Sequence, residues 1–121
     1  MAHTAQAHQP RRLTAEHRMV DGVCVVTLRG EIDHDVKDQL SRALLSGNET
    51  APPRIVADLA GVTFLDSSGI NVFVATYQHV SGAGGWIRIA GAQHSVLRVL
   101  QVVGIDTVID CHPTTEQALT A

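Results

Sequence analysis

Aromatic residues are scarce in this sequence, at 3% of its 121 positions. Hydrophobic residues still make up 45%, so we expect a core built from aliphatic side chains. Proteins that bind single-stranded nucleic acid without sequence preference stack the bases on exposed aromatic rings. One Trp, one Tyr and two Phe do not supply such a platform, and that class is excluded.

Positive charge is also in short supply. The 9 Lys and Arg residues are outnumbered by 12 Asp and Glu, which gives a formal net charge of −3. Domains that bind DNA or RNA carry a basic excess, because phosphate contacts supply most of their affinity. The charge balance therefore predicts no direct contact with nucleic acid.

Long apolar runs are absent and cysteine is rare. No stretch approaches the about 20 apolar residues that a membrane-spanning helix needs, and residues 1–12 lack the apolar centre of a signal peptide. Cys24 and Cys111 are far apart in the chain and match no metal or redox spacing. We therefore expect a cytoplasmic protein with reduced thiols and no membrane contact.

The chain divides into a polar start and one domain. Residues 1–12 show no periodicity and contain a proline, which predicts a disordered tail. Residues 13–121 have the size of a single domain and contain no internal repeat.

Strands and helices alternate along that domain. Strands are predicted from apolar and β-branched runs at 13–18, 23–28, 54–59, 86–90 and 107–109. Asp21-Gly22 predicts a hairpin turn, and Gly30 is expected to end the second strand. A loop is predicted over 48–53. The pattern as a whole indicates an α/β fold with a largely parallel or mixed sheet covered by helices.

Helices are predicted where apolar residues recur at helical spacing. The first follows a cap at Asp33, the second begins at Ile70, the third is closed by Gly104, and a short last one starts with a capping box over 114–117. Their apolar positions are Val36, Leu40, Ala43 and Leu44; then Ile70, Phe73, Val74, Tyr77 and Val80; then Val96, Leu97, Leu100 and Val103.

The turn Asp66-Ser67-Ser68-Gly69 is the most informative stretch. It connects a strand to a helix, and so it places two serine hydroxyls at a helix N-terminus. Backbone N–H groups there lack partners within the helix, and the end of the macrodipole is positive, so a phosphate is well tolerated. The simpler interpretation is that Asp66 or Ser67 caps the helix.

A second acidic turn, Gly30-Glu31-Ile32-Asp33-His34, also comes after a strand. Loops that leave the C-terminal ends of parallel strands share one rim of a sheet. If the two strands are neighbours, Asp33 and Asp66 lie side by side, and function is expected on that rim.

Two catalytic alternatives can be weighed on the same residues. Ser67 or Ser68 could act as a nucleophile with His34 and Asp33 as base and orienting group, but the turn lacks the G-x-S-x-G form of a nucleophile elbow. No histidine pair has the spacing of a metal site, so we expect no metal and no cofactor. The histidines are His3, His8, His17, His34, His79, His94 and His112.

Taken together, these motifs resemble the STAS domain, and specifically the stand-alone bacterial anti-sigma factor antagonists. The resemblance covers roughly residues 13–120 and rests on Gly30 to His34, on the strand ending in Asp58-Leu59, on Val62 to Ile70, on Gly84-Gly85, and on Val96 to Leu100 followed by Gly104-Ile105. It implies a mixed sheet of four to five strands with helices packed mainly on one face. Where the family often has a glycine, this chain has Asn71.

The resemblance implies a regulatory binding protein that is not an enzyme. Its partner would be an anti-sigma factor that is also a serine kinase and that phosphorylates Ser67, with Ser68 as the second candidate; a serine phosphatase would reverse the modification. The unmodified protein would bind the kinase, as a monomer or weak dimer, and release the sigma factor. The expected partner surface comprises Glu31, Asp33, His34, Asp66, Ser67, Ser68, Gly69, Ile70 and Asn71.

A second function remains open within the same family. STAS domains also serve as subunits of transport assemblies or of stressosome-like scaffolds, in which the serine turn is idle. The intact Asp66-Ser67-Ser68-Gly69 turn favours the switch, since a packing role does not require two exposed hydroxyls.

Overall fold

The computed structural model describes residues 12–46 and 52–121. Residues 1–11 of the predicted tail and residues 48–51 of the loop predicted over 48–53 lie outside the described residues.

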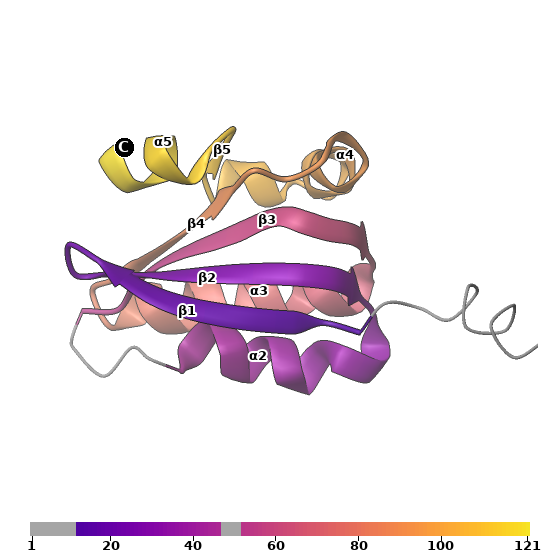
Figure 1. Ribbon diagram of the computed structural model, residues 1–121, viewed down its shortest axis with the longest axis horizontal. Helices are drawn as coiled ribbons and strands as arrows, with labels where there is room; N and C mark the ends of the chain where they lie inside the picture. Colours follow the sequence, from indigo (N-terminus) through magenta and orange to yellow (C-terminus); the bar gives the residue numbers. More distant parts are fainter. Residues whose placement is uncertain (1–11, 47–51) are drawn as a thin grey trace, which may run out of the picture.

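One mixed sheet forms the centre of the fold (Figure 1). The strands are β1 (Thr14–Val20), β2 (Val23–Ile32), β3 (Arg54–Leu65), β4 (Trp86–Ala90) and β5 (Cys111–His112), and their order in space follows their order in sequence. β1 pairs with β2 in antiparallel fashion, and all later pairs are parallel. The prediction of a mixed sheet is confirmed.

The connections between the parallel strands are helical. They contain the short 3₁₀ helix η1 (His34–Val36), α2 (Lys37–Leu45), α3 (Ser67–Gly82), α4 (His94–Val102) and a second 3₁₀ helix η2 (Ile105–Thr107); α5 (Thr115–Thr120) ends the chain. α3 begins three residues before the predicted Ile70, because Asp66 caps it with its side chain.

The helices lie mainly on one face of the sheet, as predicted. α2 and α3 run beneath β1, β2 and β3 in Figure 1, and α2, α3 and α4 contribute buried residues to the larger of two apolar clusters. The smaller cluster lies on the other face, under α5. Along β2, alternate residues enter the two clusters: Val26 and Leu28 the larger one, Val25 the smaller. Each fully buried side chain of this size contributes about 2 kcal/mol of hydrophobic stabilisation.

The hairpin between β1 and β2 has the turn that its sequence predicts. Asp21 and Gly22 both have positive φ, at 51° and 82°, as a two-residue type I′ turn requires. Val20 and Val23 face each other across it. The turn therefore fixes the register of the antiparallel pair.

Two strand boundaries differ from prediction. Gly30 does not end β2: with φ of 108° it lies at a shift in register, and the strand continues to Ile32. β3 likewise runs past residue 59 to Leu65, because a shift near Gly61 lets it stay paired with β2. Because the two strands stay paired through these shifts, they end at Ile32 and Leu65, immediately before the caps Asp33 and Asp66.

The prediction of a strand at 107–109 is wrong. Gly104, with φ of 81°, turns the chain into η2, and the backbone N–H of Ile109 donates to the carbonyl of Ile105 at 2.8 Å. Ile105 and Ile109 are both buried, so an apolar run that looked like a strand is a compact turn. The edge strand β5 comes after it, at Cys111–His112.

Candidate functional site

The two acidic turns lie side by side at one rim of the sheet. β2 and β3 are neighbouring parallel strands, with Ile32 opposite Leu65 at their ends. The backbone N–H of Asp66 donates to the carbonyl of Ile32 at 3.2 Å, which connects the second turn to the first. The strand adjacency on which the predicted rim depends is therefore confirmed.

Asp33 and Asp66 cap their helices in the same way. Each has extended backbone angles, and each side chain accepts a hydrogen bond from the backbone N–H two residues later. Those donors are Asp35, at 3.0 Å, and Ser68, at 2.9 Å. Both carboxylates thus satisfy backbone groups that a helix N-terminus leaves without partners.

The residues of the serine turn differ in exposure. Ser67 is exposed, Asp66 and Ser68 are half-buried, and Gly69 and Ile70 are buried. Ser67 is therefore the hydroxyl that the turn presents to solvent, in the first turn of α3.

Gly69 sets how closely α3 approaches the strands. A Cβ at this position would overlap the side chains of Leu65 and Ile32, which end β3 and β2. Only glycine allows the start of α3 to rest against both strand ends, and this close approach holds the serine turn at the rim.

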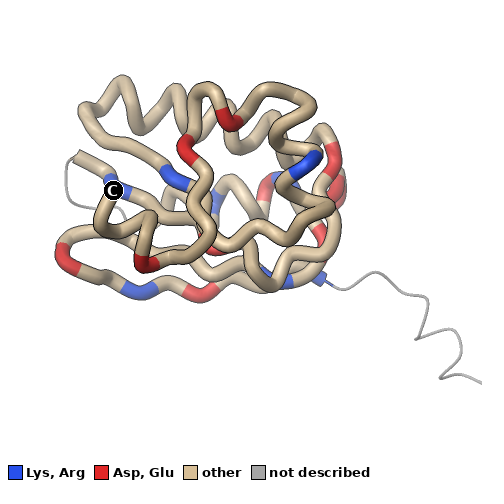
Figure 2. The backbone as a smooth tube through the Cα atoms, turned by 90° about the horizontal axis from the view of Figure 1, so that it is seen from above, with Lys and Arg blue, Asp and Glu red and all other residues tan. Residues whose placement is uncertain are grey.

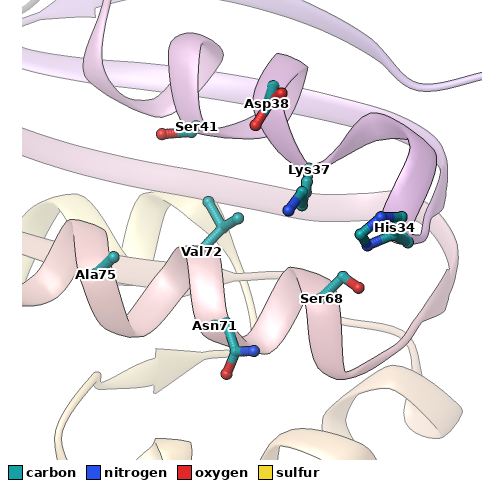
Figure 3. Close-up of a pocket in the computed structure, with 8 residues that line it drawn as sticks. All are labelled: His34, Lys37, Asp38, Ser41, Ser68, Asn71, Val72 and Ala75. Atoms are coloured by element: carbon teal, nitrogen blue, oxygen red, sulfur yellow. The ribbon is translucent and has the colours of Figure 1, made fainter.

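A groove runs from the rim between α2 and α3 (Figure 3). Its volume is about 430 Å³. His34, Ser68 and Asn71 of the predicted surface line it, and His34 and Lys37 lie across the groove from Ser68. The sequence analysis missed the other lining residues, which are Lys37, Asp38, Ser41, Val72 and Ala75. Their helical spacing from His34 and Ser68 is the signal that could have found them.

Glu31 is half-buried beside an apolar residue that the sequence analysis also missed. Its register partner on β3 is Phe64, which is 46% exposed although it is one of only two phenylalanines. An exposed ring two residues before Asp66 adds an apolar element to the acidic rim.

The arrangement offers no catalytic relay among the described residues. His34 and Ser68 share the groove, but no hydrogen bond joins them in the described part of the chain. The carboxylate of Asp33 accepts from a backbone N–H instead of orienting a histidine. Over 12–46 and 52–121, no group of three or more His, Cys, Asp or Glu residues could hold a metal ion.

Both thiols have raised pKa values. Burial raises the pKa of Cys24. Burial, and then the charges of Asp106 and Asp110, raise the pKa of Cys111 to about 11. Cys111 lies on β5, at the far side of the sheet from the hairpin. Neither thiol takes part in the rim.

The helices of the described segments are each too short or too polar to cross a lipid bilayer.

Comparison with known proteins gives a consistent result. The family model of the STAS domain matches residues 14–118. A crystal structure of an anti-sigma factor antagonist from Mycobacterium paratuberculosis superimposes with a TM-score of 0.80 at 32% identity, over 90% of this chain and 92% of that one. The anti-sigma-F factor antagonist RsfA of Mycobacterium tuberculosis is 29% identical over 91% of this chain and 86% of its own length. The anti-sigma-B factor antagonist of Bacillus subtilis is 29% identical over 75% and 83%, respectively.

Proposed function

Because this chain belongs to the STAS-domain family, we propose that it is an anti-sigma factor antagonist whose binding is switched by phosphorylation of Ser67. In this proposal the unmodified protein binds an anti-sigma factor that is also a serine kinase, and thereby releases a sigma factor. Phosphorylation of Ser67 ends the binding, and a serine phosphatase restores it. The protein is a regulatory binding protein of the cytoplasm and not an enzyme.

The observation that carries the proposal is the exposure of Ser67 at the N-terminus of α3. A kinase can reach this hydroxyl without unfolding the turn, whereas Ser68 is half-buried and donates its backbone N–H to Asp66. The helix N-terminus supplies backbone N–H groups and a positive dipole end to the resulting phosphate. The modified protein can therefore keep its fold.

The switch is explained by charge. A phosphate adds about −1.5 to −2 charges at neutral pH. At Ser67 these join Asp66 and the neighbouring Asp33, on a rim that the partner must cover. Bringing such a surface against acidic groups of a partner costs several kcal/mol, on the order of the penalty for a buried unpaired charge. That cost ends binding with no change of conformation.

Most residues of the proposed partner surface are accessible on the rim, and two are not. Its exposed or half-buried members are Glu31, Asp33, His34, Asp66, Ser67, Ser68 and Asn71. Gly69 and Ile70 are buried, and their contribution is to hold the start of α3 in place. Phe64 extends the surface with an apolar contact, and Lys37 extends it into the groove.

The test uses two matched alanine variants and the candidate kinase from the same host. Wild type, Ser67→Ala and Ser68→Ala are incubated with the kinase and Mg-ATP, and phosphate is located by mass spectrometry. We expect wild type and Ser68→Ala to be labelled on Ser67, and Ser67→Ala to remain unlabelled.

If Ser67→Ala were labelled at the wild-type level and Ser68→Ala were not, the phosphorylated residue would be Ser68, and the assignment to Ser67 would be wrong. Binding to an anti-sigma factor without any phosphoserine would retain the antagonist role and remove the switch. A protein that is neither labelled nor bound would instead fit the second function, a subunit of a transport or stressosome-like assembly.

A further inference from the structure

Among the described residues, the outer edge of β1 is a long strand edge without a partner strand. β1 spans seven residues at one end of the sheet, whereas the opposite edge strand, β5, has two. In the described part of the chain, no strand pairs with the outer side of β1. α2 holds it from below, through Gln39 to the carbonyl of Leu13 and through His17 to the carbonyl of Ala43. Such an edge presents free backbone N–H and C=O groups to another strand.

The hairpin determines which backbone groups point outward. A two-residue turn makes Val20 and Val23 a hydrogen-bonded pair, and such pairs alternate along an antiparallel ladder. The even-numbered residues of β1 therefore bond to β2, and the odd-numbered residues Ala15, His17 and Met19 direct their groups away from it. The carbonyl of Leu13 fits this parity, because it is free to accept from the side chain of Gln39.

Parity limits how a second copy of β1 can pair with this edge. In an antiparallel pair of identical strands, odd residues must face odd residues to form the ladder. Centring the pair on His17 places Glu16 opposite Arg18 of the other copy, twice by symmetry. Moving the centre to Glu16 or to Arg18 places two like charges directly opposite each other, which destabilises a sheet.

We propose that β1 pairs with β1 of a second copy of this chain in antiparallel register centred on His17, so that two sheets become one. Acidic and basic positions follow each other along this edge, which is the lower one in Figure 2. Arg18 is exposed and has no ion pair among the described residues. Glu16 is 3.4 Å from Arg29 in an exposed pair, so Arg18 of the second copy completes a row of alternating charges.

The other face of the new pair carries the odd-numbered residues, with the two exposed His17 side chains opposite each other at its centre and an apolar contact on either side. Met19, which is 54% exposed, lies opposite Ala15 of the second copy in this register. A strand edge with two such contacts, related by symmetry, buries less surface than the about 1,600 Å² of a standard interface, so the dimer is weak and depends on concentration.

The proposal goes beyond the proposed function and leaves its site free. β2 and β3 end at the rim that carries Ser67. The two-fold axis lies between the two His17 residues, so the two rims lie at opposite ends of the joined sheet. One dimer thus presents two separate copies of the rim.

Charge reversal tests both the edge and the register. The variants are Arg18→Glu, Glu16→Arg, the double variant with both changes, and Arg98→Glu as a control for the same charge change at an exposed position on α4. Dissociation constants are measured by sedimentation over a wide range of protein concentration, with circular dichroism to show that each variant is folded.

We expect wild type and Arg98→Glu to dimerise equally. Either single β1 variant should weaken the dimer about tenfold or more, since two opposite-charge pairs become like-charge pairs. The double variant should restore it, because the pairs are opposite in charge again. The proposal would be overturned by any of three results: wild type is monomeric, the single variants dimerise as wild type does, or the double variant dimerises as weakly as the single variants.

Discussion

At the scale of single residues, Asp33 and Asp66 make the same hydrogen bond at the starts of two neighbouring helices. The residues after the two caps differ. Asp66 precedes Ser67 and Ser68, whereas Asp33 precedes His34, which cannot accept a phosphate at a hydroxyl. The same capping hydrogen bond therefore orders both turns, and in the second turn it also holds the backbone next to the serine that we propose is phosphorylated, Ser67.

Asp33 can be tested as a cap and as a contact separately. Asp33→Ala removes the cap and should lower the free energy of unfolding by about 1 kcal/mol. Asp33→Asn keeps an equally good cap and removes only the charge. We expect Asp33→Asn to unfold like wild type in urea but to bind the anti-sigma factor with altered affinity in calorimetry.

Glu116→Gln is the control for that experiment, since it removes the same charge at an exposed position on α5, outside the proposed partner surface. If Asp33→Asn binds and is modified like wild type, Asp33 is a cap and nothing more.

Gly69 gives a prediction about packing. Gly69→Ala forces a methyl group into the side chains of Ile32 and Leu65, so we expect a loss of about 1–3 kcal/mol in the free energy of unfolding. Gly82→Ala is the matched control at the other end of α3, where a Cβ would have no atom within 4 Å. It should leave stability unchanged or raise it by up to about 1 kcal/mol. Equal effects of the two changes in urea unfolding would contradict the close approach at Gly69.

At the scale of elements, the sequence predicts best where local and long-range preferences agree. The strand at 86–90 and the cap at Asp33 are found as predicted. So is the cap of α5, where the hydroxyl of Thr114 accepts from the backbone N–H of Gln117 at 3.1 Å. In none of these cases does a contact distant in sequence override the local preference.

The elements that were mispredicted depend on partners distant in sequence. Gly30 looks like a strand end, and only the pairing with β3 turns it into an irregularity within β2. The apolar run at 107–109 has strand composition, but the burial of Ile105 and Ile109 in one turn outweighs it. A tertiary contact overrides local preference in both places.

The same division applies to the site. The rim could be predicted, because parallel strands end together and each turn carries its own cap. The groove and the exposure of Phe64 could not, since they depend on how closely α2 and α3 pack and on the irregular register of β3.

The start of α3 gives a prediction of its own. Ser67→Glu places an anion where the helix dipole favours it, so the thermal melting temperature should stay within a few degrees of wild type. Affinity for the anti-sigma factor should fall, because the added charge lies on the proposed partner surface. Ser67→Gln is the matched neutral variant. Equal affinity of Ser67→Glu and Ser67→Gln in calorimetry would contradict a switch based on charge.

At the scale of the whole molecule, the thiols link stability to alkaline pH. The pKa of Cys111 is raised to about 11 in the folded chain, from an ordinary value of 9.0. Between these values the unfolded chain loses the thiol proton first, so the folded state binds more protons and the free energy of unfolding falls as pH rises. The raised pKa of Cys24 acts in the same direction.

We therefore expect wild type to lose stability between pH 9 and pH 11, and Cys111→Ala to lose less over the same interval. Urea unfolding at several pH values provides the comparison, and its difference between the two proteins removes the contribution of all other groups. A pH dependence that is the same in both proteins would show that this thiol titrates normally.

The hydrogen bond from Asp66 to Ile32 has a consequence for whatever enzyme acts on Ser67. It ties the serine turn to the end of a central strand, and Gly69 rests against the same strand end. The shape around the hydroxyl therefore exists only in the folded protein, and it brings together residues more than thirty positions apart in sequence. If Ser67 is modified as proposed, we expect its kinase to recognise a folded surface instead of a linear motif. A synthetic peptide that contains Asp66-Ser67-Ser68-Gly69 should then be phosphorylated poorly compared with the folded protein.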